Sequence, residues 1–256
     1  MPKSLPVGRG AWIWHLLGAN GVAADLAGAV ARCKSARLSH VFVDAGSDSL
    51  WSQFNKPMVD AFHAAGIQVF GWGYQNTAND EGKAALVKRV HDLGADGYCI
   101  DAEKEWERPD ADAQAREYVT ELQALKLADH FLLAHAPFDV IANHQSFPYT
   151  VLGSVCDFVA PQAYWSEHCM TVEGSTRRAL EQWAAYRAKH PTSCNALQPI
   201  GYCVKPDSGY HTPTGAEIRT FEQMCKAAGC AATSLWRFDG IDPAAYAWLC
   251  GNDWAA

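Results

Sequence analysis

Short apolar runs alternate with amphipathic segments along the whole chain. The apolar runs are rich in β-branched and aromatic residues, as strands are, and they lie at 11–15, 40–44, 68–74, 97–101, 131–134, 158–163, 196–201 and 233–237. Segments with a helical spacing of apolar residues lie between or after them, at 22–34, 56–65, 80–93, 111–127, 175–190, 215–228 and 243–249, with a weak helix expected around 139–144. The pattern therefore predicts eight strand–helix repeats.

The predicted strands are apolar almost throughout, which is typical of parallel strands that are covered on both faces. Neither a break in composition nor a linker interrupts the repeats, so we expect residues 1–256 to form a single domain. The α/β fold that accommodates eight repeats in one domain is a closed (β/α)8 barrel, the TIM barrel. A doubly wound open sheet is the alternative, but no G-x-G-x-x-G motif follows the first strand.

Length, charge and hydropathy narrow the class of protein further. A length of 256 residues is close to the roughly 200–250 residues that one α/β barrel commonly uses. The 21 basic and 28 acidic side chains give a net charge of −7, which argues against nucleic acid as a partner. The apolar runs are far shorter than the roughly 20 residues of a membrane helix, so we expect no membrane insertion.

The start of the chain does not have the pattern of a signal peptide, because the apolar run at 11–17 contains His15. We therefore expect the protein to be cytoplasmic as synthesised, so a role at the cell wall would need a separate route of export or release. We also expect a monomer.

The nine cysteines include no C-x-x-C pair, although a bridge between Cys194 and Cys203 or between Cys225 and Cys230 stays open. No H-E-x-x-H motif or tight His/Asp spacing is present, so we expect neither a metal nor another cofactor.

Polar and aromatic side chains gather at the carboxyl ends of the predicted strands, where barrel enzymes place their active sites. These candidate site residues are Trp14, Asp44, Trp72, Asp101, Glu103, Gln162, Tyr164, Trp165 and Trp236. Indole and phenol rings suit the apolar faces of sugars, while carboxylates and amides suit their hydroxyl groups. The pattern predicts a carbohydrate cleft, although some of the rings could fill the barrel instead and Asp44 could cap a loop.

The fourth predicted strand carries the candidate chemistry. Because side chains alternate between the faces of a strand, Cys99, Asp101 and Glu103 share the barrel interior, and the Cα atoms of the two acids lie about 7 Å apart. Two neighbouring carboxyl groups in a partly dry pocket cannot both ionise at low cost, so one keeps a proton near neutral pH. Glycoside hydrolysis needs such a pair. The plainer alternative is that this D-x-E motif caps a loop.

Three motifs resemble those of glycoside hydrolase family 18, the chitinases and endo-β-N-acetylglucosaminidases. The run Asp-Gly-Tyr-Cys-Ile-Asp-Ala-Glu at 96–103 resembles the family signature D-G-x-D-x-D-x-E, with Cys99 in place of the first interior Asp. The run Pro-Gln-Ala-Tyr-Trp at 161–165 resembles the sixth-strand Q-x-Y of plant-type members, and Trp236 resembles their eighth-strand tryptophan. The third-strand S-x-G-G is replaced by Phe-Gly-Trp-Gly-Tyr at 70–74.

The resemblance implies a role for each matching residue. Glu103 would be the general acid and base, which protonates the glycosidic oxygen and later activates water. Asp101 would orient the 2-acetamido group of the substrate, whose carbonyl oxygen attacks the anomeric carbon in place of a protein nucleophile. Tyr164 would hydrogen-bond the acetamido oxygen with Gln162 alongside, and Trp236 would form the floor of the −1 subsite. The implied substrate is a β-linked N-acetylhexosamine polymer, either peptidoglycan or chitin-like.

Two other functions stay open. Family 25 muramidases also carry a D-x-E on the fourth strand, and a lysin of that type would use Glu103 without acetamido assistance; their first-strand Asp is missing here, where Trp-Ile-Trp stands at 12–14. A barrel that binds carbohydrate without catalysis would explain Cys99 and the altered third strand. The intact Asp101–Glu103 pair argues against that last alternative.

Overall fold

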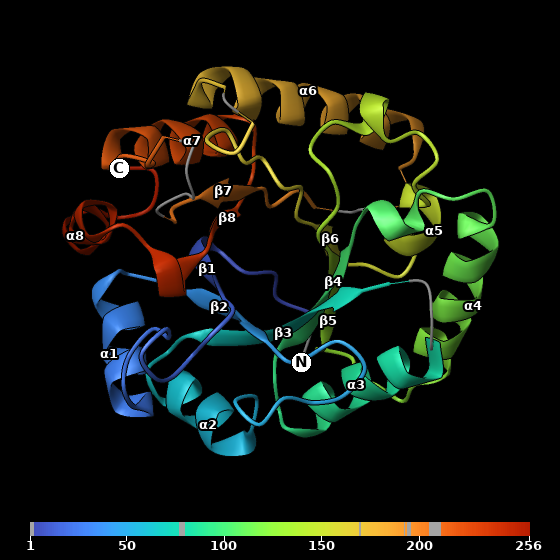
Figure 1. Cartoon of the computed structure of the whole chain (residues 1–256). Helices are drawn as coiled ribbons and strands as arrows, with labels where there is room; N and C mark the ends of the chain where they lie inside the picture. The colour runs from blue at the N-terminus through green and yellow to red at the C-terminus, as the bar shows by residue number, and fades with distance from the viewer. Residues whose placement is uncertain (1–2, 77–79, 169, 192, 194–195, 205–210) are drawn as a thin grey trace.

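Eight parallel strands form a ring that is surrounded by helices in the computed structural model, which describes residues 3–76, 80–168, 170–191, 193, 196–204 and 211–256 (Figure 1). The strands are β1 (Gly8–Ile13), β2 (His40–Asp44), β3 (Gln68–Gln75), β4 (Gly97–Ala102), β5 (Leu132–His135), β6 (Phe158–Val159), β7 (Ile200–Tyr202) and β8 (Ala232–Trp236). The helices are α1 (Leu26–Ser35), α2 (Lys56–Ala64), α3 (Asp80–Asp92), α4 (Ala111–Ala124), α5 (Tyr149–Gly153), α6 (Val172–Lys189), α7 (Gly215–Ala227) and α8 (Pro243–Gly251).

The sheet closes on itself. Its hydrogen-bonded order is β6-β5-β4-β3-β2-β1-β8-β7, and all of these pairs are parallel. The remaining gap between β6 and β7 is closed by two parallel bridges, Val159 with Leu197 and Gln162 with Ile200. The backbone N–H of Ile200 also donates to the carbonyl of Pro161 at 2.8 Å. The predicted (β/α)8 barrel is therefore confirmed, and the open-sheet alternative is wrong.

Local capping accounts for the main shifts in helix boundaries. Helix α1 begins at Leu26, later than predicted, because the Asp25 side chain accepts the backbone N–H of Gly28 at 2.7 Å and caps the helix there. Helix α6 begins earlier than predicted because Thr171 caps it in the same way. The weak helix expected around 139–144 is a single 3-10 turn at Ile141–Asn143, and the short helix α5 follows it.

The barrel interior is packed with side chains from alternate positions of the strands. This interior cluster comprises Trp12, Phe42, Phe70, Trp72, Cys99, Leu132, Ala134, Ala136, Phe158, Ala160 and Ile200. Cys99 thus points inward, whereas Tyr98 and Ile100 belong to the layer between strands and helices, as the alternation predicts. The described interior is a solid core, and in barrels of this fold the substrate site lies at the carboxyl ends of the strands.

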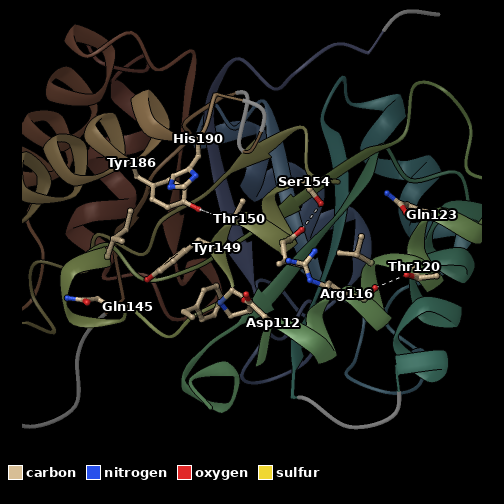
Figure 2. Close-up of a pocket in the computed structure, with 15 residues that line it drawn as sticks. Asp112, Arg116, Thr120, Gln123, Gln145, Tyr149, Thr150, Ser154, Tyr186 and His190 are labelled. Carbon is tan, nitrogen blue, oxygen red and sulfur yellow. Dashed lines mark hydrogen bonds between the residues drawn. The ribbon is translucent and has the colours of Figure 1, made fainter. Parts of the chain in front are cut away.

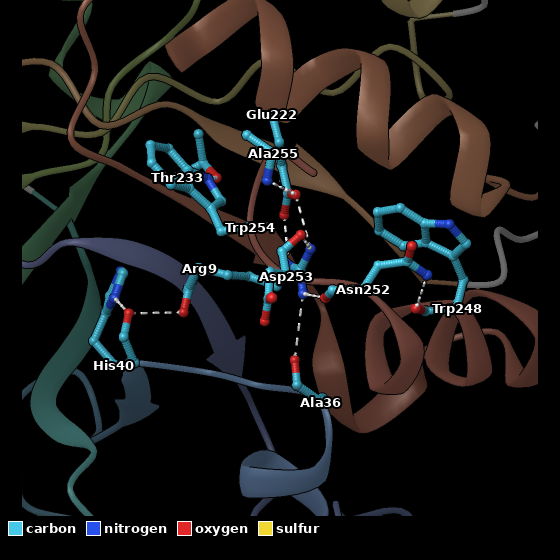
Figure 3. Close-up of polar contacts among 11 residues, drawn as sticks. Arg9, Ala36, His40, Glu222, Thr233, Trp248, Asn252, Asp253, Trp254 and Ala255 are labelled. Carbon is cyan, nitrogen blue, oxygen red and sulfur yellow. Dashed lines mark hydrogen bonds and ion pairs between the residues drawn. The ribbon is translucent and has the colours of Figure 1, made fainter.

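A buried ion pair lies at the amino-terminal end of the barrel (Figure 3). Arg9 of β1 and Glu222 of α7 are both inaccessible to solvent, and their two hydrogen bonds measure 2.5 and 2.8 Å. Arg9 also donates to the carbonyl of Asn252 at 2.9 Å, and the backbone N–H of Ala255 donates to Glu222 at 2.9 Å. The C-terminal segment is therefore fixed against this end of the barrel.

Cys225 and Cys230 are both free thiols, so the bridge between them is not formed. Cys194, half of the other bridge left open, lies outside the described residues. None of the helices that the structure describes is both long and apolar enough to cross a membrane.

Candidate active site

A cleft of about 570 Å³ lies at the carboxyl ends of the strands. It brings together eight of the nine residues predicted from the sequence, all except Trp165. The lining residues are Trp12, Trp14, Asp44, Ser47, Trp51, Trp72, Tyr74, Asp101, Glu103, Ala136, Phe138, Gln162, Tyr164, Glu167, His168, Ile200 and Trp236. The barrel thus gathers one acidic, amide and aromatic site from positions that span most of the chain.

One amide group joins the two acids of the D-x-E motif. Asp101 lies near the end of β4 on the interior face and is 8% exposed, while Glu103 follows the strand and is half-buried. The Nε2 atom of Gln162 donates to Asp101 Oδ1 at 3.2 Å and to Glu103 Oε1 at 3.1 Å. The same nitrogen lies 3.1 Å from the carbonyl oxygen of Ala136, which fixes the amide orientation. Both carboxyl groups are therefore held on the same side of the cleft.

Burial makes both acids harder to ionise. It raises the pKa of Asp101 well above its ordinary value, and the neighbouring charges of Glu103 and Asp44 raise it further. Burial also raises the pKa of Glu103, although the hydrogen bond from Gln162 partly opposes that effect. The pair therefore retains a proton at a pH at which ordinary carboxyl groups have lost theirs. A site of this kind can donate a proton near neutral pH.

A third carboxyl group lies at the end of β2. Asp44 is 5% exposed, lines the cleft and accepts the backbone N–H of Gly46 at 2.7 Å, so it both caps the loop and faces the cleft. Burial raises its pKa to about 6, and the charge of Asp239 adds to the effect. Asp44 pairs in register with Trp72, which pairs with Cys99 on the next strand. Asp44 therefore places a carboxyl group at the same height along the barrel axis as Cys99 of β4.

Three indole rings form the floor of the cleft. The rings of Trp72 and Trp236 are 5.5 Å apart, and Trp12 lies 5.5 and 6.2 Å from them. The indole N–H of Trp72 donates to the carbonyl of Ile13, and that of Trp12 donates to the hydroxyl of Ser234. Trp12 and Trp72 are almost completely buried, whereas Trp236 is partly exposed. Trp236 is thus the floor residue that can present its ring to a sugar, and the other two support it.

The phenol of Tyr164 lies beside this floor. Its ring is stacked against that of Trp236 with an interplanar angle of 25° and 6.4 Å between centroids. Burial and the charges of Asp101 and Glu103 raise the pKa of the Tyr164 hydroxyl well above its ordinary value. The hydroxyl therefore stays protonated and can act as a hydrogen-bond donor toward a bound substrate.

The rim carries two aromatic residues that are not among the nine candidate site residues. Trp51 and Tyr74 line the cleft with 40% and 37% of their surface exposed, beside the predicted Trp14 at 39%. Tyr74 shares the interior face of β3 with Trp72, so the two-residue period could have found it. Trp51 lies in an irregular loop after β2, where no periodic pattern indicates the direction of a side chain.

The prediction that Trp165 contacts substrate is wrong. Its side chain is completely buried, and its ring lies 5.5 Å from that of Phe221 in α7. Tyr164, one residue earlier, faces the cleft, so Trp165 projects to the opposite side of the chain and packs beneath α7. It stabilises the wall of the barrel from outside.

Among the residues that the structure describes, no group of three or more His, Cys, Asp or Glu side chains is arranged to hold a metal ion. The cleft combines a carboxyl pair that retains a proton, an amide, a phenol and an indole floor. In a closed barrel, with the acid pair at the end of the fourth strand, this arrangement is typical of glycoside hydrolases.

Comparison with known proteins agrees with this class at the level of the fold. No protein-family model matches the sequence, and no curated protein matches it. The solved structures that match include the chitinase RmChi1 from Rhizomucor miehei, with 14% identity, coverage of 95% of this chain and 99% of that chain, and a TM-score of 0.66. A GH18 chitinase from Pseudoalteromonas aurantia has 13% identity, coverage of 95% and 98%, and a TM-score of 0.62.

The spore cortex-lytic enzyme SleL from Bacillus cereus matches 98% of this chain and 75% of its own, with 10% identity and a TM-score of 0.69. At such low identities the likeness shows a shared fold. The chain therefore has the fold of family 18 chitinases and of SleL, and the family resemblance drawn from residues 96–103 is confirmed at that level.

Proposed function

We propose that this protein is a retaining glycoside hydrolase that cleaves β-linked polymers of N-acetylhexosamine, either peptidoglycan or chitin-like. The observation that carries the proposal is the contact of one Gln162 amide with both Asp101 and Glu103, beside the ring of Trp236. The structures that share the fold are named chitinases and a spore cortex-lytic enzyme, which favours polymers of this chemistry.

In the proposed reaction, the acetamido N–H of the bound substrate favours the ionised form of Asp101, so the proton of the pair lies on Glu103. Glu103 then protonates the glycosidic oxygen as the bond to the anomeric carbon breaks. Asp101 accepts a hydrogen bond from the N–H of the substrate's 2-acetamido group and so directs its carbonyl oxygen toward the anomeric carbon. That oxygen forms the new bond and gives a cyclic oxazolinium ion, which Asp101 stabilises by its charge. Water then attacks the anomeric carbon as its bond to the acetamido oxygen breaks, and Glu103 takes the proton from the water. The acetamido group is regenerated, and the product keeps its original configuration.

The remaining cleft residues hold the sugar during these steps. Trp236 stacks on the apolar face of the ring at the reacting position, and Tyr164 donates its O–H to the acetamido oxygen. Gln162 restrains both acids through its hydrogen bonds, and Asp44 adds a third carboxyl group beneath them. The cleft is open at the rim, where Trp14 and Trp51 can contact further sugars of a polymer.

The test is to digest purified peptidoglycan and chitin oligomers and to identify the new reducing ends by mass spectrometry. We expect N-acetylglucosamine ends. N-acetylmuramic acid ends would contradict acetamido-assisted cleavage at N-acetylglucosamine and support a muramidase. Binding of either polymer without cleavage would contradict hydrolysis and support a carbohydrate-binding barrel.

A further inference from the structure

A second hollow lies on the outer wall of the barrel, between α4, the connection from β5 to α5, α5 itself and α6 (Figure 2). Its volume of about 820 Å³ exceeds that of the catalytic cleft, and the two share no lining residue. We call it the α4–α6 groove. Its lining comprises Asp112, Arg116, Val119, Thr120, Gln123, Ile141, Gln145, Phe147, Pro148, Tyr149, Thr150, Val151, Ser154, Tyr186 and His190.

A connected series of rings forms one side of this groove. The ring centroids of Phe147 and Tyr149 are 4.6 Å apart, those of Tyr149 and Tyr186 are 5.7 Å apart, and those of Tyr186 and His190 are 4.4 Å apart. The Tyr186 hydroxyl shares a 2.6 Å hydrogen bond with that of Thr150, which fixes the ring before any ligand binds. Phe147 and Tyr149 are buried and support the series, whereas Tyr186 and His190 are partly exposed. A fixed, partly exposed ring such as that of Tyr186 can stack on the apolar face of a sugar at little cost in entropy.

The polar groups of the groove suit hydroxyl and amide groups of a ligand. Gln123, Gln145 and Thr120 are exposed and uncharged, and the buried hydroxyl of Tyr149 has no hydrogen-bond partner among the described residues. Figure 2 shows the guanidinium of Arg116 directed from α4 into the groove. Such a mixture of rings, amides and hydroxyls is typical of carbohydrate sites.

The charge and length of the groove also favour a carbohydrate ligand. Among the described lining residues, Arg116 is the one permanent cation and Asp112 the one carboxylate, so the groove does not select a polyanion. Lining residues on α4 run from Asp112 to Gln123, which spans about 16 Å at the helical rise. The groove is therefore long enough for an extended oligomer.

Aromatic contacts connect the catalytic cleft with this groove. Phe138 lines the cleft, stacks on His144 at 3.5 Å and contacts Phe147, a groove residue, at 5.7 Å. A smaller hollow of about 460 Å³ lies along the same connection and shares Phe138, Gln162 and His168 with the cleft. The groove therefore lies on the side of the cleft that Phe138 forms.

We propose that the α4–α6 groove is an accessory glycan-binding site that holds a polysaccharide strand outside the catalytic cleft. The choice of an N-acetylhexosamine polymer as its ligand rests on the proposed function. Stacking on Tyr186 and hydrogen bonds from Arg116 and Gln145 would bind the strand. The site would raise the affinity for long or insoluble polymers and add nothing for ligands that are too short to leave the cleft.

The experiment measures the binding of Arg116→Ala and Tyr186→Ala to insoluble chitin and to purified peptidoglycan. Arg177→Ala removes an exposed arginine of α6 outside the groove and is the matched control. Both groove variants are also made in a Trp236→Ala protein, in which the catalytic cleft binds less. We expect each groove variant to weaken polymer binding at least about fivefold in either background and the control to match its parent.

Equal binding by Arg116→Ala and Arg177→Ala would overturn the accessory site, whatever the enzyme cleaves. Melting temperatures are recorded, and if Tyr186→Ala proves unstable, the exposed Arg116 decides the result alone. Loss of polymer binding in the groove variants of a protein that cleaves nothing would support the accessory site and refute the hydrolase. Cleavage of a polymer together with unchanged binding by the groove variants would support the hydrolase and refute the accessory site.

Discussion

Replacement of Asp44 by asparagine should stabilise the folded protein at neutral pH. Burial raises the pKa of Asp44 from 3.8 to about 6, so the folded protein holds this proton more tightly than the unfolded chain does. The free energy of unfolding therefore falls as the pH rises from 3.8 to about 6, and it stays lower above that range. At 1.36 kcal/mol per pKa unit, the loss in the wild type is about 3 kcal/mol.

The asparagine side chain would keep the oxygen that accepts the Gly46 N–H and would carry no charge at any pH. We expect Asp44→Asn to raise the free energy of unfolding by about 2–3 kcal/mol at pH 7.5 and to leave it unchanged at pH 3. For a chain of this size the gain corresponds to roughly 5–10 °C in melting temperature.

The assay is urea unfolding at a series of pH values, followed by fluorescence. Asp48→Asn makes the same change at an exposed position four residues further along the chain, and it should alter stability little at either pH. A stability difference between Asp44→Asn and the wild type that does not vary with pH would refute the reasoning. Lower stability of the variant at pH 7.5 would refute it as well.

Three further outcomes follow from the geometry. Glu222→Ala should cost about 3–5 kcal/mol in urea unfolding, because it leaves Arg9 buried without its partner; a cost below about 1 kcal/mol would contradict the buried pair. Trp236→Ala should weaken the binding of an N-acetylglucosamine oligomer in calorimetric titration, and unchanged affinity in a folded variant would exclude Trp236 from the site. Tyr164→Phe should lower kcat about tenfold or more with little change in KM, whereas a rise in KM alone would make Tyr164 a ground-state contact.

The sequence predicts the number and order of the strands, and it places β2, β3, β4, β5 and β8 to within one residue. The predicted bounds of β1, β6 and β7 are wrong, because β1 begins three residues earlier, β6 ends four residues earlier and β7 begins four residues later than predicted. The two-residue period of β4 alone places Asp101 and Glu103 together at the open end of the barrel, with Cys99 beneath them. This placement depends only on local geometry. It succeeds because β4 is regular as far as Ala102, the residue just before Glu103.

The same period fails after β6, which is only two residues long. Beyond Val159 the chain is no longer a regular strand, and sequence alone did not show that Trp165 would lie behind the wall while Tyr164 faces the cleft. The ion pair of Arg9 with Glu222 could not be predicted from the sequence either, because its partners are 213 residues apart and no local pattern indicates a buried charge. Nor does any local pattern place the loop residue Trp51 at the rim.

The most direct test of the account is the turnover of Glu103→Gln on an unactivated N-acetylglucosamine polymer. The substitution keeps the shape of the side chain and removes the acid, so kcat should fall about 10²–10⁴-fold while the protein still folds and binds the polymer. Glu167→Gln makes the same change at an exposed carboxylate of the same cleft and should keep most of the activity. Near-wild-type turnover by Glu103→Gln would contradict the central claim.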